Sequence, residues 1–105
     1  MFLFKKRRRA RLRNAPFPSE WIAILRRNVP YYRRLTPAEQ AELCGHIQVF
    51  LHEKRFEGCG GLEVTEAMRL TIAGQACTLL LNRESDYFPG MQTIFLYPRY
   101  FQVRE

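Results

Sequence analysis

The sequence lacks long apolar runs and has few residues that bind metals or form disulfides. No uninterrupted apolar stretch approaches 18 residues, so a membrane-spanning helix is not expected. The only two histidines, His46 and His52, lie six positions apart and diverge around a helix, which argues against joint metal binding from it. They are expected to be ordinary packing or surface residues.

Cysteines are also scarce, and their number and spacing indicate free thiols. Three cysteines cannot form a closed set of intrachain disulfides, and none of the spacings is a CxxC. Cys44 and Cys77 fall in apolar helical patterns and are expected in the core, whereas Cys59 lies in a glycine-rich turn. The chain starts with apolar residues followed by basic ones, the reverse of a secretory signal. We therefore expect a cytoplasmic protein with reduced cysteines.

Acidic residues are absent from the first 13 positions, which hold seven of the 17 basic residues. The other ten basic residues are balanced by ten acidic ones, so the net charge of +7 belongs to the N-terminal end. A like-charge block predicts a solvated, disordered arm over residues 1–14, removable at positions 1–13 without loss of the fold. Two alternatives are an anchor to anionic lipid through Phe2, Leu3 and Phe4, and non-specific contact with nucleic acid.

Periodicity and capping signals predict three helices after the arm, over residues 20–27, 37–54 and 66–81. Thr36 and Glu39 have the spacing of a capping box, with a proline at the first helical position. Ser19 and Thr65 are expected to cap the other two helices. The helix at 66–81 is apolar around most of its circumference, which predicts burial on several sides.

Strand signals are few. Residues 93–97 predict a strand covered on both faces, and residues 62–64 are a weaker candidate after the glycine cluster at 58–61. The fold class is thus α+β, a helical scaffold with one or two short strands. Because its apolar elements exceed what 105 residues can cover, residues 15–105 are interpreted as an incomplete domain that exposes an apolar patch.

No residue pattern announces an activity. His52 and Glu53 begin like the zinc-protease motif HExxH, but Phe56 stands where the second histidine is needed. The glycine cluster at 58–61 lacks the GxxxxGK[ST] pattern of a phosphate loop, and nothing indicates a base that would activate Cys59. No catalytic, cofactor-binding or metal-ligating residue is therefore assigned.

Several ordered segments nevertheless resemble one bacterial family, the Mlc titration factor A or glucose-regulated zinc metallopeptidase family. The segments are FPSEW (17–21), NVPYY (28–32), FLHEKRFEGCGGLEVT (50–65), IAGQACTLLL (72–81), DYFPG (86–90) and IFLYP (94–98). The resemblance implies a zincin-like peptidase in which HExxH lies well downstream of these segments. It also implies a zinc cofactor, a peptide substrate and a transcriptional repressor as partner of the complete protein.

The resemblance carries over no catalytic or zinc-binding residue to this chain. What it implies here is the N-terminal scaffold portion of such a peptidase, with no cofactor of its own and inactive alone. The alternative hypothesis is a self-contained binding module that uses the basic arm for nucleic acid or an anionic membrane.

Overall fold

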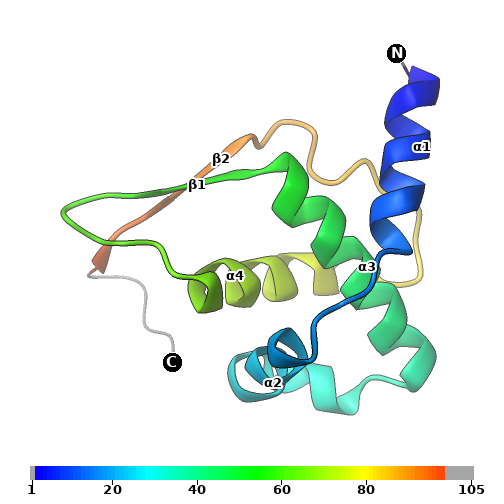
Figure 1. The fold of residues 1–105 in the computed structure, drawn as a ribbon, viewed down its shortest axis with the longest axis horizontal. Helices are drawn as coiled ribbons and strands as arrows, with labels where there is room; N and C mark the ends of the chain where they lie inside the picture. Colours follow the sequence, from blue (N-terminus) through cyan, green and yellow to red (C-terminus); the bar gives the residue numbers. More distant parts are fainter. Residues whose placement is uncertain (1, 99–105) are drawn as a thin grey trace.

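The computed structural model describes residues 2–98, which form four α-helices, a 3₁₀ helix and two short strands (Figure 1). The elements are α1 (Phe2–Arg13), α2 (Ser19–Asn28), η1 (Pro30–Arg34), α3 (Pro37–Glu53), β1 (Arg55–Gly58), α4 (Glu66–Thr78) and β2 (Thr93–Leu96). The α+β class is confirmed. Within the described part of the chain, none of the helices has the length and hydropathy needed to cross a bilayer.

Two of the three predicted N-cap residues, Thr36 and Thr65, cap their helices in the structure. The capping box is present, since the Glu39 amide donates to Thr36 Oγ1 and the Thr36 amide donates to Glu39 Oε1, both at 3.1 Å. Thr65 likewise accepts a bond of 3.2 Å from the backbone three residues later. Ser19 was wrongly expected as a cap: it is the first residue of α2, and Pro18 holds the N-cap position without a side-chain bond.

Helix α4 is shorter than the predicted 66–81, and residues 79–82 continue as turns. Leu70 and Cys77 face α2 and α3 in the core. Beyond the helix, two neighbouring leucines differ in exposure: Leu80 is 5% exposed, whereas Leu79 is 64% exposed. The apolar circumference is therefore only partly covered by the described residues.

The two strands form a parallel pair in which Arg55 is opposite Thr93 and Gly58 is opposite Leu96. The prediction of a strand at 62–64 was wrong, because pairing with β2 selects the residues before the glycine turn. Gly60 and Gly61 turn the chain with φ values of 62° and 82°, a conformation that glycine adopts without steric cost.

Strand β2 matches the predicted 93–97 to within one residue at its end. Its faces are not both covered, contrary to the expectation. Phe95 is 55% exposed, whereas Leu96 is buried. The sheet of two strands thus leaves an aromatic side chain in water.

The core lies between α2, α3 and α4. Its largest fully buried side chains are Tyr87, Phe50, Leu25, Leu43, Ile47 and Leu70. Leu12 of α1 and Phe56 of β1 pack against this cluster from its edges. Both the N-terminal helix and the sheet are therefore continuous with one core.

The N-terminal segment differs from the disordered arm that the sequence predicted. Residues Phe2–Arg13 form α1, which packs along α3 at the edge of the molecule (Figure 1). Gly45 permits this approach, because a Cβ there would lie 3.0 Å from the carbonyl oxygen of Arg13. The physical reason for the difference is a single buried arginine, Arg9, whose partners lie far along the chain.

Candidate functional site beneath helix α1

Arg9 is the hub of the most extensive polar network in the described residues. It is 8% exposed, and its Nε and Nη2 lie 2.8 Å from the two carboxylate oxygens of Glu53 at the end of α3. Its Nη1 lies 2.6 Å from Oδ1 of Asp86, in the segment that joins α4 to β2. Such fork-shaped pairing is stronger and more directional than a single contact. One side chain therefore ties α1 to both α3 and the 79–92 segment.

The ion pairs fix the charge states of all three groups. Hydrogen bonds from Arg9 hold the pKa of Glu53 and that of Asp86 below their usual ranges. The Glu53 hydrogen bond in turn raises the pKa of Arg9. Because both carboxylates stay ionised and engaged, neither is suited to donate a proton as a general acid.

A second chain of hydrogen bonds starts under the same arginine, whose guanidinium carbon lies 4.9 Å from the centre of the Tyr87 ring. The Tyr87 hydroxyl is 2.7 Å from His46 Nδ1, and His46 Nε2 is 3.1 Å from Glu42. If the imidazole is neutral, a Glu42 carboxylate accepts from Nε2–H and Nδ1 accepts from the tyrosine hydroxyl. Arg13 then donates to the tyrosine oxygen at 3.2 Å. The Tyr87 hydroxyl and both ring nitrogens of His46, at the buried centre of this chain, thus have partners.

The backbone at Tyr87 and Phe88 is strained. Their φ values are 57° and 54°, a left-handed conformation that bulky residues rarely adopt. The Lys54 ammonium stabilises the segment by donating to the carbonyl oxygens of Phe88 at 2.9 Å and Met91 at 2.5 Å. Burial lowers the pKa of Lys54. Strain of this kind persists only where surrounding contacts over-determine the conformation.

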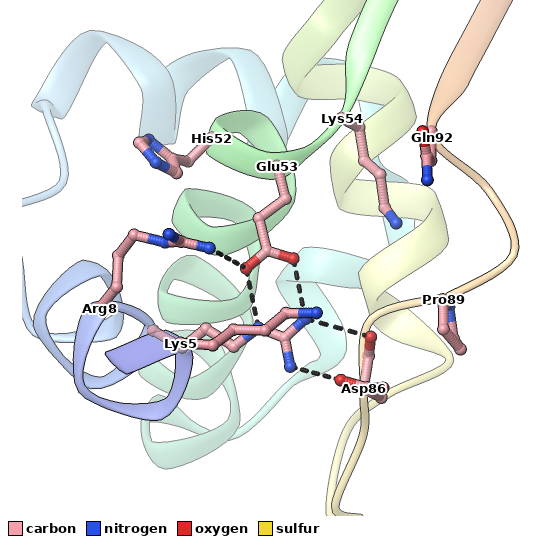
Figure 2. Close-up of a pocket in the computed structure, with 9 residues that line it drawn as sticks. Lys5, Arg8, His52, Glu53, Lys54, Asp86, Pro89 and Gln92 are labelled. Atoms are coloured by element: carbon pink, nitrogen blue, oxygen red, sulfur yellow. Dashed lines mark hydrogen bonds and ion pairs between the residues drawn. The ribbon is translucent and has the colours of Figure 1, made fainter. Parts of the chain in front are cut away.

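A hollow of about 350 Å³ opens beside this network (Figure 2). It is lined by Lys5, Arg8, Arg9, His52, Glu53, Lys54, Asp86, Pro89 and Gln92. Arg8 approaches Glu53 at 3.9 Å, and Lys54 points toward the segment that carries Asp86 (Figure 2). Its walls carry more basic than acidic groups, and the two carboxylates are occupied by arginine.

The histidines and cysteines considered in the sequence analysis do not form one site in the structure. His46 is buried in the tyrosine chain, while His52 is exposed at the rim of the hollow. Burial raises the pKa of Cys44 to about 11 and raises that of Cys77 further, so neither thiol is reactive at neutral pH. Cys59 stays in the glycine turn, half-buried.

Sequence reasoning gave no site role to Arg9, Asp86 or Tyr87, although the last two belong to the DYFPG segment of the family resemblance. Arg9 is one of seven basic residues in the first 13 and carries no local mark that separates it from the others. The one available signal was Glu53, an acidic residue at a helix end, where the helix dipole alone does not favour it. Among residues 2–98, no group of three or more His, Cys, Asp or Glu could hold a metal ion.

Two curated proteins are similar to this chain. It is 42% identical over 98 residues to the uncharacterized protein slr2042 of Synechocystis sp., an alignment that covers 93% of this chain and 36% of that protein. It is 31% identical over 75 residues to Mlc titration factor A of Klebsiella pneumoniae, covering 71% of this chain and 28% of that protein. The chain thus spans about a third of the length of these relatives. No solved structure is significantly similar.

A family match extends over nearly the whole sequence. Residues 4–105 match the family described as glucose-regulated metallo-peptidase M90. The match begins inside α1, so the basic helix lies within the family region and is not an appended tail. The resemblance read from the sequence is confirmed, and the chain belongs to the glucose-regulated metallo-peptidase M90 family.

Proposed function

We propose that these residues form the N-terminal scaffold portion of a zinc-dependent peptidase and hydrolyse no peptide by themselves. The observation that carries the proposal is the family match over residues 4–105. The short coverage of the relatives, 36% and 28% of their lengths, supports assigning the catalytic groups to other parts of the complete protein. The scaffold would belong to a zincin-like domain.

Zinc does not fit the donor atoms of residues 2–98. A zinc site of the HExxH kind needs two histidines one helical turn apart. Both ring nitrogens of His46 already have partners, and α3 ends at Glu53, so Phe56 lies in β1 rather than on the same helix as His52. Glu53 itself is bound by Arg9. No catalytic step through zinc is therefore assigned to these residues.

The apolar surface supports the scaffold role. A sheet of two strands is marginal in water, and β1 and β2 pair only with each other in the described part of the chain. Leu79 and Phe95 are both more than half exposed. We infer that further parts of a zincin-like domain cover these side chains in the complete protein.

The proposal includes a peptide substrate and a reducing, cytoplasmic location, the latter resting on the three free cysteines. The Klebsiella relative is named for titration of Mlc. A transcriptional repressor is accordingly the partner that we propose for the complete protein.

A chimera tests the scaffold role. The 98 matched residues of the Synechocystis protein are replaced with their counterparts from this chain, and zinc content and hydrophobic-dye binding are measured after gel filtration. We expect the unaltered Synechocystis protein to bind zinc and the chimera to bind as much. We also expect the chimera to bind less dye per chain than the 105 residues alone. The same chimera carrying Leu80→Asp is the matched control for failed packing.

The same zinc measurement, together with a peptide-cleavage assay, is made on the isolated 105-residue chain. We expect it to hold no stoichiometric zinc and to cleave no peptide library. A tightly bound zinc or peptide cleavage by the isolated chain would overturn the proposal. So would a chimera that does not fold when the parent protein does.

A further inference from the structure

We propose that the outer face of helix α1 binds the surface of anionic phospholipid bilayers. Leu3 and Phe4 would insert among the headgroups, and Arg7 and Arg11 would contact lipid phosphates. The proposal concerns side chains other than Leu79 and Phe95, which we assigned to the scaffold role, and its argument does not depend on the peptidase assignment.

The buried arginine defines which side of α1 faces outward. Arg9 is held against α3 and the 79–92 segment, so its direction marks the inner side of the helix. At ~100° per residue, Leu3, Phe4, Arg7 and Arg11 fall within an arc of about 100° opposite Arg9. Leu3 is 55% exposed and Phe4 is 69% exposed, and both arginines are exposed as well. The helix therefore presents two apolar and two basic side chains on one outer face.

The composition of this face matches a lipid headgroup layer. Interfacial helices place apolar side chains at the boundary of the acyl chains and basic side chains beside the phosphates. Helix α1 contains no Asp or Glu among its twelve residues, so no acidic group on it repels an anionic surface. The apolar pair lies in the first turn, and that end of the helix points away from the rest of the molecule (Figure 1).

Docking on the body makes this face a fixed surface. Arg9 is engaged in ion pairs with Glu53 and Asp86 on the inner side of the helix. Arg7 and Arg11 lie on the outer side and are exposed. Among the described ion pairs, neither of these two arginines has an acidic partner. A helix already folded loses less conformational entropy on binding than a disordered arm would.

Charge distribution favours lipid over nucleic acid. A surface that binds duplex DNA spreads cations over a face, and its phosphate contacts gain nothing from exposed Leu and Phe at a helix tip. Outside the first 13 residues the chain has ten basic and ten acidic residues, so the excess of positive charge belongs to α1. The apolar pair beside the arginines is the feature that a bilayer uses and a phosphate backbone does not.

Vesicle cosedimentation of the 105-residue chain tests the proposal. The vesicles are phosphatidylcholine alone or phosphatidylcholine with about 30% phosphatidylserine. Two double variants are compared, Leu3→Ser with Phe4→Ser, and Arg7→Gln with Arg11→Gln. The matched control is Arg33→Gln with Arg34→Gln, which changes the net charge equally at two exposed positions in η1.

We expect the chain to bind the anionic vesicles, and each α1 double variant to weaken binding by roughly tenfold or more. The control should stay within about twofold of the unaltered chain. Circular dichroism and melting must be unchanged in all variants, since all six residues are exposed. The proposal is overturned if the chain ignores anionic vesicles, if the control weakens binding as much, or if loss of Leu3 and Phe4 has no effect. Binding of a DNA duplex without vesicle binding would also overturn it.

Discussion

Arg9 and Glu53, 44 positions apart, form a two-pronged ion pair in which Nε and Nη2 of the arginine each lie 2.8 Å from a different carboxylate oxygen. Asp86 completes the cluster from the other side. A segment that looks like a solvated tail is thereby built into the fold. Its removal would leave Glu53 in a largely enclosed position without its main partner, so residues 1–13 are not expected to be dispensable.

Replacing Arg9 with Met should destabilise the chain by about 1–3 kcal/mol, because a partly buried carboxylate loses its charged donors. Urea unfolding followed by circular dichroism measures the change. Arg11→Met on the exposed side of the same helix is the control and should stay within about 0.5 kcal/mol. Equal effects of the two changes would show that Arg9 contributes no more than a surface charge.

The same ion pair predicts loss of stability in acid. Arg9 lowers the pKa of Glu53 below its ordinary value of 4.5, so the unfolded chain takes up a proton at a higher pH than the folded chain does. The stabilisation is complete above this ordinary value and decreases as pH falls through the lowered folded pKa. Unfolding free energies between about pH 3 and 7 should therefore converge for the unaltered chain and Arg9→Met at the acidic end. Parallel curves would contradict this linkage, and Glu57→Gln at an exposed position is the control.

Tyr87→Phe tests the buried hydrogen-bond chain. Removing the hydroxyl leaves His46 Nδ1 without its 2.7 Å partner in a buried position, at a cost of about 1–3 kcal/mol. Tyr31→Phe removes a hydroxyl from an exposed ring and should have no measurable effect. If both variants unfold at the same urea concentration as the unaltered chain, the hydrogen bond adds nothing to stability.

Of two neighbouring leucines, Leu80 belongs to the core, and Leu79 belongs to the surface that we assign to contact with the rest of the peptidase. In the 105-residue chain, Leu80→Asp should cost several kcal/mol because it buries an unpaired charge. Leu79→Asp should cost little there, since that side chain is 64% exposed. In the chimera with the Synechocystis protein, Leu79→Asp should also become destabilising. A Leu79→Asp chimera as stable as its parent would mean that this leucine stays in water.

Local signals account for the parts of the fold that the sequence predicted. Thr36 and Glu39 act through their own side chains and neighbouring amides, so the start of α3 is readable without knowledge of the rest. Residues 55–58 carry no such mark. They are polar or glycine except Phe56, and they become a strand only because Thr93–Leu96 lies alongside them. Pairing across 38 positions is information that a local pattern does not contain.

The candidate site was less predictable than the fold for the same reason. Nothing local distinguishes Arg9 from its six basic neighbours, because its role depends on partners 44 and 77 positions away. The left-handed backbone at Tyr87 is equally unpredictable from the sequence, because tertiary contacts impose it. Charge composition predicted a cationic segment correctly but could not decide which of its members would be buried.

The parallel pairing of β1 with β2 has a consequence for biosynthesis. On the ribosome, β1 is complete many residues before β2 leaves the exit tunnel, and parallel strands cannot close as a simple hairpin. The helices can pack before β2 is available, and the backbone groups along the edge of β1 stay unpaired during that time. That interval is the period in which a nascent chain is open to mispairing with a neighbour on the same polysome.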